Sequence, residues 1–107
     1  MLQVGLNPYG MCCTFGLIGQ GTDRGAPEPL GLEDFIELGA QVGARCLEID
    51  FRFLASLSKE ELTVIAGRLR DAGMVPILST GAPTDRLAQV LEAAVAIGCK
   101  LIRMALT

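Results

Sequence analysis

The sequence repeats one plan, in which an apolar, helix-like stretch ends in glycine and a short strand-like stretch follows. The glycines are Gly43, Gly73 and Gly98. They lie about 25 to 30 residues apart, which is close to the length of one strand–helix unit. A glycine at this place can adopt the left-handed conformation that closes a helix. The repeat therefore predicts alternating strands and helices, and right-handed crossovers between them produce a parallel sheet.

The apolar pattern gives the expected bounds. Strands are expected at about 3–7, 46–51, 75–79 and 101–105. Helices are expected at about 32–42, after Ser58, and from about 84 or 85 to 97. Ser58 and Glu61 have the spacing of a capping box, with Ser58 as the N-cap. In the first helix Val42 is predicted to face inward, and in the third helix Leu87 and Leu91 are predicted to do so.

One connection is much longer than the others. It runs from about residue 8 to 31, is rich in glycine and proline, and has no clear periodicity. Most loops between a strand and a helix have only ~2–6 residues. Because it follows the first strand, it is expected at the sheet edge where parallel α/β enzymes bind ligands. A functional lid and a plain surface excursion both fit this pattern.

Charged side chains alternate with apolar ones in the second and fourth expected strands. Glu48 and Asp50 should face the side of the sheet opposite the helices, and so should Arg103. Carboxylates inside a barrel are costly unless they are paired or solvated, and alternate strands share interior layers. We therefore expect a Glu48–Arg103 or an Asp50–Arg103 contact. It would either only neutralise charge or form a polar floor that contacts a polyol or a phosphate.

Three polar residues lie where expected strands end. Asn7 and Tyr9 follow the first strand, and Thr80 follows the third. Each could contact a substrate at this edge of the sheet. Turn chemistry explains Asn-Pro and Thr-Gly sequences equally well, and it is the interpretation that the residue types favour.

Composition excludes several kinds of protein. Hydrophobic residues make up 50% of the chain and charged residues 20%, which is too apolar for disorder. A net charge of −3 provides no basic surface, so we expect no nucleic-acid partner. No apolar run reaches the ~20 residues of a membrane span, so we expect no membrane association. The first residues lack the features of a signal peptide, which predicts a cytoplasmic location.

The chain contains no histidine. This excludes a Ser-His-Asp triad, a Cys-His pair and a histidine metal site within these residues. Four cysteines are present, at positions 12, 13, 46 and 99, without a Cys-x-x-Cys motif. Cys46 and Cys99 lie at the starts of apolar strands, where cysteine usually acts as a small buried hydrophobe. A metal site here would have to use carboxylates or thiolates alone.

Five segments resemble a known family. Residues 32–39 and 43–49, with Glu48 in the strand, resemble the first helix and second strand of the sugar phosphate isomerase/epimerase group, the xylose-isomerase-like TIM barrels. Residues 58–62 and 69–74 are similar to the second helix and the start of the third strand of that group. Residues 91–103 are similar to its third helix and fourth strand. The match covers nearly the whole chain, and it consists of hydrophobic patterns rather than a catalytic signature.

The resemblance implies an α/β fold, a partial (β/α) TIM barrel with about four parallel strands and three helices in β-α-β-α-β-α-β order over residues 1–107. Since a whole barrel takes ~250 residues, the chain is expected to be the N-terminal half of a divalent-metal-dependent sugar or sugar phosphate isomerase or epimerase. Members bind a metal such as Mn, Mg, Zn or Co through two Glu, an Asp and a His from later strands, so no cofactor is expected in this chain. Glu48 matches the strand-two glutamate, with a substrate-side or structural role. The implied partner is a small-molecule sugar or sugar phosphate.

Two alternatives stay open. An endonuclease IV-like member of the same fold would need histidines and a basic, DNA-facing surface beyond these residues. A non-catalytic half-barrel would associate with a copy of itself, as a homo-oligomer, or with a complementary half. Such association would cover the two outer strands, which are otherwise open edges. We expect no catalysis from these residues alone.

Overall fold

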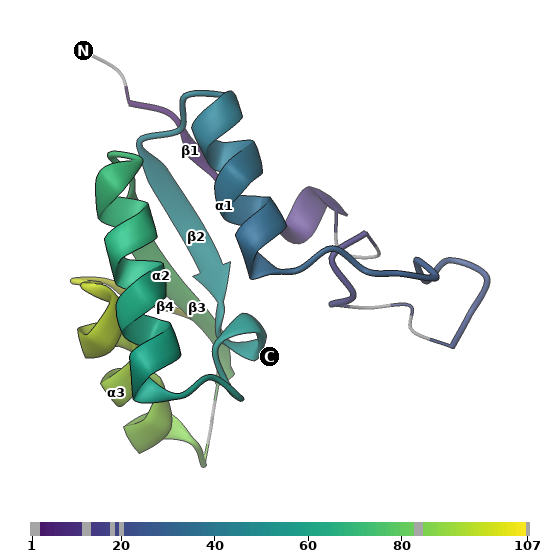
Figure 1. The fold of residues 1–107 in the computed structure, drawn as a ribbon. Coiled ribbons are helices and arrows are strands. Elements are labelled where there is room, and N and C mark those ends of the chain that lie inside the picture. Colours follow the sequence, from purple (N-terminus) through teal and green to yellow (C-terminus); the bar gives the residue numbers. More distant parts are fainter. Residues whose placement is uncertain (1–2, 12–13, 18, 20, 83–84, 107) are drawn as a thin grey trace.

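A computed structural model describes residues 3–11, 14–17, 19, 21–82 and 85–106. Within these residues, four parallel strands form one sheet in the order β1-β2-β3-β4, and three α-helices connect them. All three helices lie on the same face of the sheet (Figure 1). The predicted α/β class and the predicted order of elements are confirmed. The arrangement is consistent with half of a (β/α) barrel.

The bounds agree with the predicted ones to within a few residues. The strands are β1 (Gly5–Leu6), β2 (Cys46–Asp50), β3 (Val75–Ala82) and β4 (Ile102–Leu106). The helices are α1 (Leu32–Gln41), α2 (Lys59–Asp71) and α3 (Leu87–Ile97), with short 3-10 turns at η1 (Tyr9–Met11) and η2 (Phe51–Phe53). β1 is shorter and β3 longer than predicted, and the expected helix start at residue 84 lies outside the described residues. Among the described helices, none has the length and apolar character needed to cross a bilayer.

The helix ends form as the sequence predicts. Gly43, Gly73 and Gly98 follow the three helices with φ angles of 73°, 70° and 81°, in the left-handed region that favours glycine. At the start of α2, the Ser58 hydroxyl accepts a hydrogen bond from the Glu61 N–H, and the Glu61 carboxylate accepts one from the Ser58 N–H, each 3.1 Å long. The capping box is therefore confirmed. The glycines therefore mark where the three helices end, and Ser58 marks where α2 begins.

The hydrophobic core lies between the sheet and its helices. The buried side chains of the two central strands include Leu47, Ile49 and Leu78, each with no exposed surface. The helices cover them with Phe35 of α1 and Val90 of α3, also fully buried. Alternation along the strands sends these residues to the helix side. It therefore also sends the residues between them to the opposite side.

Three residues that the sequence placed inward are exposed. Val42, Leu87 and Leu91 are 61%, 43% and 48% exposed. Val42 is the C-cap of α1, so it has already left the apolar side of that helix. Leu87 and Leu91 form, with Val95, a stripe at four-residue spacing on α3, because this helix buries its other side against the sheet. α3 is apolar nearly all round, and the pattern alone could not distinguish its two sides.

The long connection between β1 and α1 is held at both ends: Phe15 packs in the core, and Leu30 is hydrogen-bonded to Thr14. The Phe15 ring packs edge-on against Phe35 and Phe53, with ring centroids 5.2 Å and 6.2 Å away. The Leu30 N–H donates to the Thr14 carbonyl oxygen at 2.9 Å. Residues 21–29 project away from the body of the protein (Figure 1).

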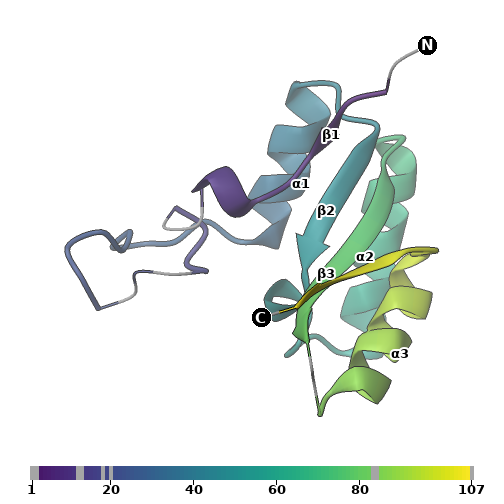
Figure 2. The same ribbon diagram turned by 180° about the vertical axis from the view of Figure 1, so that it is seen from behind.

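No described α-helix covers the opposite face of the sheet (Figure 2). The register pairs Asp50 of β2 with Ser79 of β3, and Ser79 with Arg103 of β4. These three residues therefore form one row across this face. In a closed barrel, this face would be the interior.

Candidate functional site

Polar side chains gather where the parallel strands end, on the uncovered face. Asp50 is the last residue of β2, and Ser79 and Arg103 lie beside it in the row described above. Tyr9, in the turn after β1, reaches the same place from the start of the long connection. Four consecutive strand units thus contribute to one cluster.

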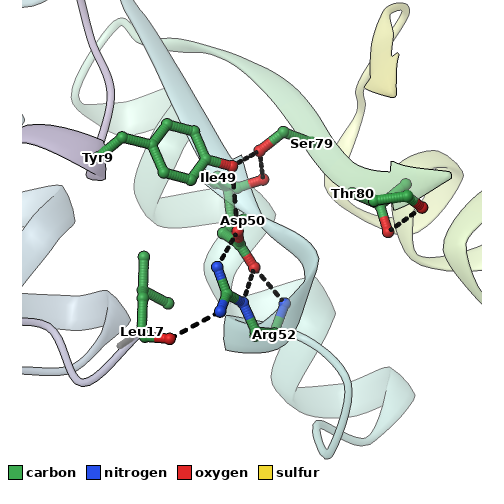
Figure 3. A network of polar contacts seen from close by, with 8 residues as sticks. Tyr9, Leu17, Ile49, Asp50, Arg52, Ser79 and Thr80 are labelled. Carbon is green, nitrogen blue, oxygen red and sulfur yellow. Dashed lines mark hydrogen bonds and ion pairs between the residues drawn. The ribbon is translucent and has the colours of Figure 1, made fainter. Parts of the chain in front are cut away.

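Tyr9 joins Asp50 and Ser79 (Figure 3). Its hydroxyl donates to Asp50 Oδ2 at 3.0 Å and lies 2.5 Å from Ser79 Oγ. Because a phenol has a single proton, Ser79 is the donor to Tyr9 whenever Tyr9 donates to Asp50. Ser79 Oγ also lies 3.4 Å from the Ile49 carbonyl oxygen, which can accept the single Ser79 proton only when that proton is not donated to Tyr9.

The proton of Tyr9 is held firmly. Burial raises the pKa of the Tyr9 phenol, and the neighbouring carboxylates of Asp50 and Glu48 add to this, while the hydrogen bond with Ser79 lowers it. The net direction is upward from the ordinary value of 10.0. Tyr9 therefore remains neutral at physiological pH, as a hydrogen-bonding group rather than a base.

Asp50 is anchored by Arg52. The Arg52 Nε and main-chain N–H both donate to Asp50 Oδ1, and Nη2 donates to Oδ2, each at 2.9 Å. Arg52 Nη1 also donates to the Leu17 carbonyl oxygen at 2.7 Å, which ties the long connection to the site. Burial alone would raise the pKa of Asp50, which is 5% exposed, but the hydrogen bonds from Arg52 outweigh it and the pKa is lowered.

Glu48 and Arg103 form the predicted ion pair. Arg103 Nε and Nη2 donate to the two carboxylate oxygens of Glu48, each at 3.0 Å. The Glu48 side chain is 17% exposed and that of Arg103 is 49% exposed. The guanidinium also lies over the Tyr9 ring, 5.4 Å from its centroid. The alternative expectation, an Asp50–Arg103 pair, is wrong because both carboxylate oxygens of Asp50 accept hydrogen bonds from Arg52.

Asn7 and Thr80 have smaller roles than the other predicted residues. Asn7 Oδ1 accepts a hydrogen bond from the Tyr9 main-chain N–H at 3.0 Å, which is turn chemistry. The Thr80 hydroxyl points away from the Tyr9 cluster, toward the Gly81 carbonyl oxygen at 3.5 Å (Figure 3). Thr80 borders the site, whereas its neighbour Ser79 takes part in the network.

Sequence reasoning missed Arg52 as a site residue. It lies in η2, directly after the second strand, where no alternation applies. The available signal was the Asp50-x-Arg52 spacing at a strand end, because an aspartate that caps a turn accepts the N–H two residues later.

A hollow of about 360 Å³ opens beside the cluster. Its lining includes Tyr9, Asp50, Arg52, Thr80, Gly81 and Arg103. The hollow therefore lies at the carboxyl ends of β2, β3 and β4. This is the edge at which parallel α/β proteins hold small molecules.

The described residues do not fit a divalent metal ion. Both oxygens of Asp50 accept from Arg52, and both oxygens of Glu48 accept from Arg103. A metal would have to displace a guanidinium from either carboxylate. No group of three histidine, cysteine, aspartate or glutamate residues comes together in the described part of the chain.

The described cysteines have thiols suited to a structural role. Cys46 and Cys99 are free and partly buried. Burial raises the pKa of Cys99 to about 11, and burial and nearby Glu48 raise the pKa of Cys46. Protonated thiols are poor metal ligands and poor nucleophiles. Cys12 and Cys13 lie outside the described residues.

Comparison with known proteins gives no assignment. No protein-family model matches the chain, and no curated protein matches it in a sequence search. The site itself must carry any argument about function.

Proposed function

We propose that the chain is the N-terminal half of a divalent-metal-dependent sugar or sugar phosphate isomerase or epimerase with a (β/α)-barrel fold. The observation that carries this proposal is the polar cluster at the carboxyl ends of four parallel strands, on the face without helices. Active sites of (β/α) barrels are built at this end. In the proposed enzyme, this half binds and orients the substrate.

The chemistry of the cluster suits a polyhydroxy compound. Each sugar hydroxyl both donates and accepts a hydrogen bond. Arg103 supplies donors, and Glu48 supplies acceptors. Glu48 is also the residue that resembles the strand-two glutamate of the sugar isomerase group. Its two hydrogen bonds with Arg103 fix the orientation of its carboxylate.

The metal of the proposed enzyme would be bound by strands that follow β4. Glu48 and Asp50 do not fit it, for the reasons given above, so these residues are assigned no step that involves the metal. Their part is to hold Arg103 and Tyr9 in place and to present hydrogen-bonding groups to the substrate. The free thiols of Cys46 and Cys99 accord with the reducing compartment that the predicted cytoplasmic location implies.

The test is to read the coding sequence beyond Thr107 and to assay the protein that it specifies. We expect further strand–helix units with Glu, Asp and His at strand ends. We also expect interconversion of ketoses and aldoses, or epimerisation, that depends on Mn²⁺, Mg²⁺, Zn²⁺ or Co²⁺. A matched assay uses the 107-residue chain alone, which should be inactive. Turnover by this chain, or a coding sequence without such units, would contradict the proposal.

A second candidate is a non-catalytic half-barrel that associates with a copy of itself. Two observations favour it: among the described strands, β1 and β4 each have a neighbour on one side only, and the α3 stripe is exposed. Unpaired strand edges readily add another strand. Light scattering of the purified chain should then give a dimer or larger species. A monodisperse monomer would count against it.

The endonuclease IV-like alternative has less support from the described residues. Arg52 and Arg103 are each paired with a carboxylate, so the uncovered face is not basic. Binding of the whole protein to abasic DNA would revive this alternative.

A further inference from the structure

The arginines that border the hollow are already neutralised. Arg52 is paired with Asp50 at 2.9 Å, and Arg103 is paired with Glu48 at 3.0 Å. Tyr9 is neutral, since its pKa is raised. The two positive and two negative charges cancel. The two ion pairs at this edge of the sheet therefore carry no net charge between them.

This balance disfavours a phosphate group. A phosphate monoester carries about −1.5 to −2 charges at neutral pH and binds arginine through the same forked geometry that a carboxylate uses. Glu48 already takes the forked Nε and Nη2 edge of Arg103, so a phosphate could bind that edge only by displacing Glu48. Because the Glu48 side chain is only 17% exposed, losing its cation would leave a largely desolvated carboxylate unpaired.

A neutral hydroxyl meets no such obstacle. A guanidinium has five N–H donors, and Glu48 takes two of those on Arg103. The Arg103 side chain is still 49% exposed, so donors remain toward the hollow. A hydroxyl of a polyol could accept from one of these remaining Arg103 donors while both ion pairs stay intact.

We infer that this hollow binds the uncharged, hydroxyl-bearing part of a polyol and discriminates against phosphate. The inference rests on the proposed function, because it names the substrate class that the sugar site accepts on this side. Any phosphate of a substrate would have to lie elsewhere in the enzyme.

The first experiment is a nuclear magnetic resonance titration of the 107-residue chain with xylitol and, separately, with inorganic phosphate. Sodium chloride of matched ionic strength serves as the reference. Xylitol should shift the Arg103 guanidinium signal and the amides of Thr80 and Gly81, whereas phosphate should leave them unchanged. Phosphate binding as tightly as xylitol, or no binding of either probe, would overturn the inference.

A substitution pair tests the charge argument directly. Glu48→Gln removes the carboxylate that neutralises Arg103, so phosphate affinity should rise roughly tenfold, as expected when a charge-assisted contact becomes available. Glu37→Gln on α1 is the matched control. It removes the same charge at an exposed site, where the Glu37 carboxylate contacts Gln41. An unchanged phosphate affinity in Glu48→Gln, or an equal rise in Glu37→Gln, would contradict the argument.

These outcomes separate the inference from the proposed function. A whole protein that isomerises sugars and binds a substrate phosphate at Arg103 would keep the proposed function and overturn the inference. If the chain binds xylitol as described but the whole protein has no isomerase or epimerase activity, the inference stands and the proposed function is overturned.

Discussion

Glu48 and Arg103 form a forked ion pair between β2 and β4, although β3 lies between these strands. Alternate strands share a layer of side chains inside a barrel, and this pair has that relationship. Arg103 also covers the Tyr9 ring. The contact thus links the first, second and fourth strand units through side chains alone.

Removing Arg103 should harm the protein more than removing the whole pair. In Arg103→Ala the partly buried Glu48 carboxylate loses its cation, whereas in the double variant Glu48→Ala/Arg103→Ala no unpaired charge remains. We expect the midpoint of thermal unfolding, followed by circular dichroism, to fall by a few degrees in Arg103→Ala and by less in the double variant. Strictly additive losses would show that the two side chains do not interact.

Tyr9 can be titrated without interference because it is the one tyrosine of a chain that has no tryptophan. Its ultraviolet absorbance should report a midpoint above the ordinary value of 10.0, because burial raises the pKa. Ser79→Ala should move the midpoint further upward, since the Ser79 hydrogen bond lowers this pKa. A downward move in Ser79→Ala would mean that Ser79 does not stabilise the ionised phenol.

Ionisation of Asp50 should make the free energy of unfolding decrease at acidic pH. Its folded pKa is lowered below the ordinary 3.8 by Arg52, against the effect of burial. A lowered carboxyl pKa contributes stability that is complete above the unfolded pKa and is lost as the pH falls through the folded pKa. Urea unfolding between about pH 5 and pH 2 should therefore show a decline in wild type that is weaker in Asp50→Asn. Parallel declines in both proteins would assign the acid sensitivity to other groups.

Replacing Gly98 or Gly67 by alanine should change the free energy of unfolding in opposite directions. Gly98 has a φ of 81° with open space around it, so Gly98→Ala should cost about 1 kcal/mol of unfolding free energy through backbone strain alone. Gly67 lies within α2, where an added Cβ would meet only the Arg70 side chain at 3.6 Å. Gly67→Ala should stabilise by about 0.5–1 kcal/mol. Urea unfolding of both variants measures this difference; no loss in Gly98→Ala, or a loss in Gly67→Ala, would contradict the prediction for that glycine.

The α3 stripe should affect association and not folding. Leu91 is 48% exposed, so Leu91→Lys should change the unfolding free energy by less than about 0.5 kcal/mol while reducing self-association in light scattering. Its neighbour Val90 is fully buried, and Val90→Ala should cost about 2 kcal/mol. If Leu91→Lys unfolds as readily as Val90→Ala, the stripe belongs to the core.

Local signals were enough to predict the order of the elements. Gly43, Gly73 and Gly98 act through their own backbone conformations, and Ser58 caps its helix through a contact three residues away. Such effects depend little on the rest of the fold, which is why the sequence alone revealed them. The Glu48–Arg103 pair needed one further assumption, a parallel sheet in which alternating residues share a face.

The remaining site residues depended on details that periodicity does not contain. Ser79, not Thr80, lies in the network because Ser79 is paired with Asp50 in the register and faces the same side of the sheet, whereas Thr80 alternates to the other side. Arg52 bonds to Asp50 because the chain turns sharply after β2. The exposure of Leu87 and Leu91 depends on which neighbours surround α3, and a single helix cannot specify these.

The clasp between Thr14 and Leu30 gives the long connection a narrow neck. A hydrogen bond of 2.9 Å joins the two ends of the connection, and the Phe15 ring packs against Phe35, so residues 21–29 project from an anchored base. Lengthening a loop of this kind costs little, roughly 0.6 kcal/mol for each doubling. The protrusion is therefore the place where an unrelated peptide could be inserted into this protein with the least effect on the packed layers.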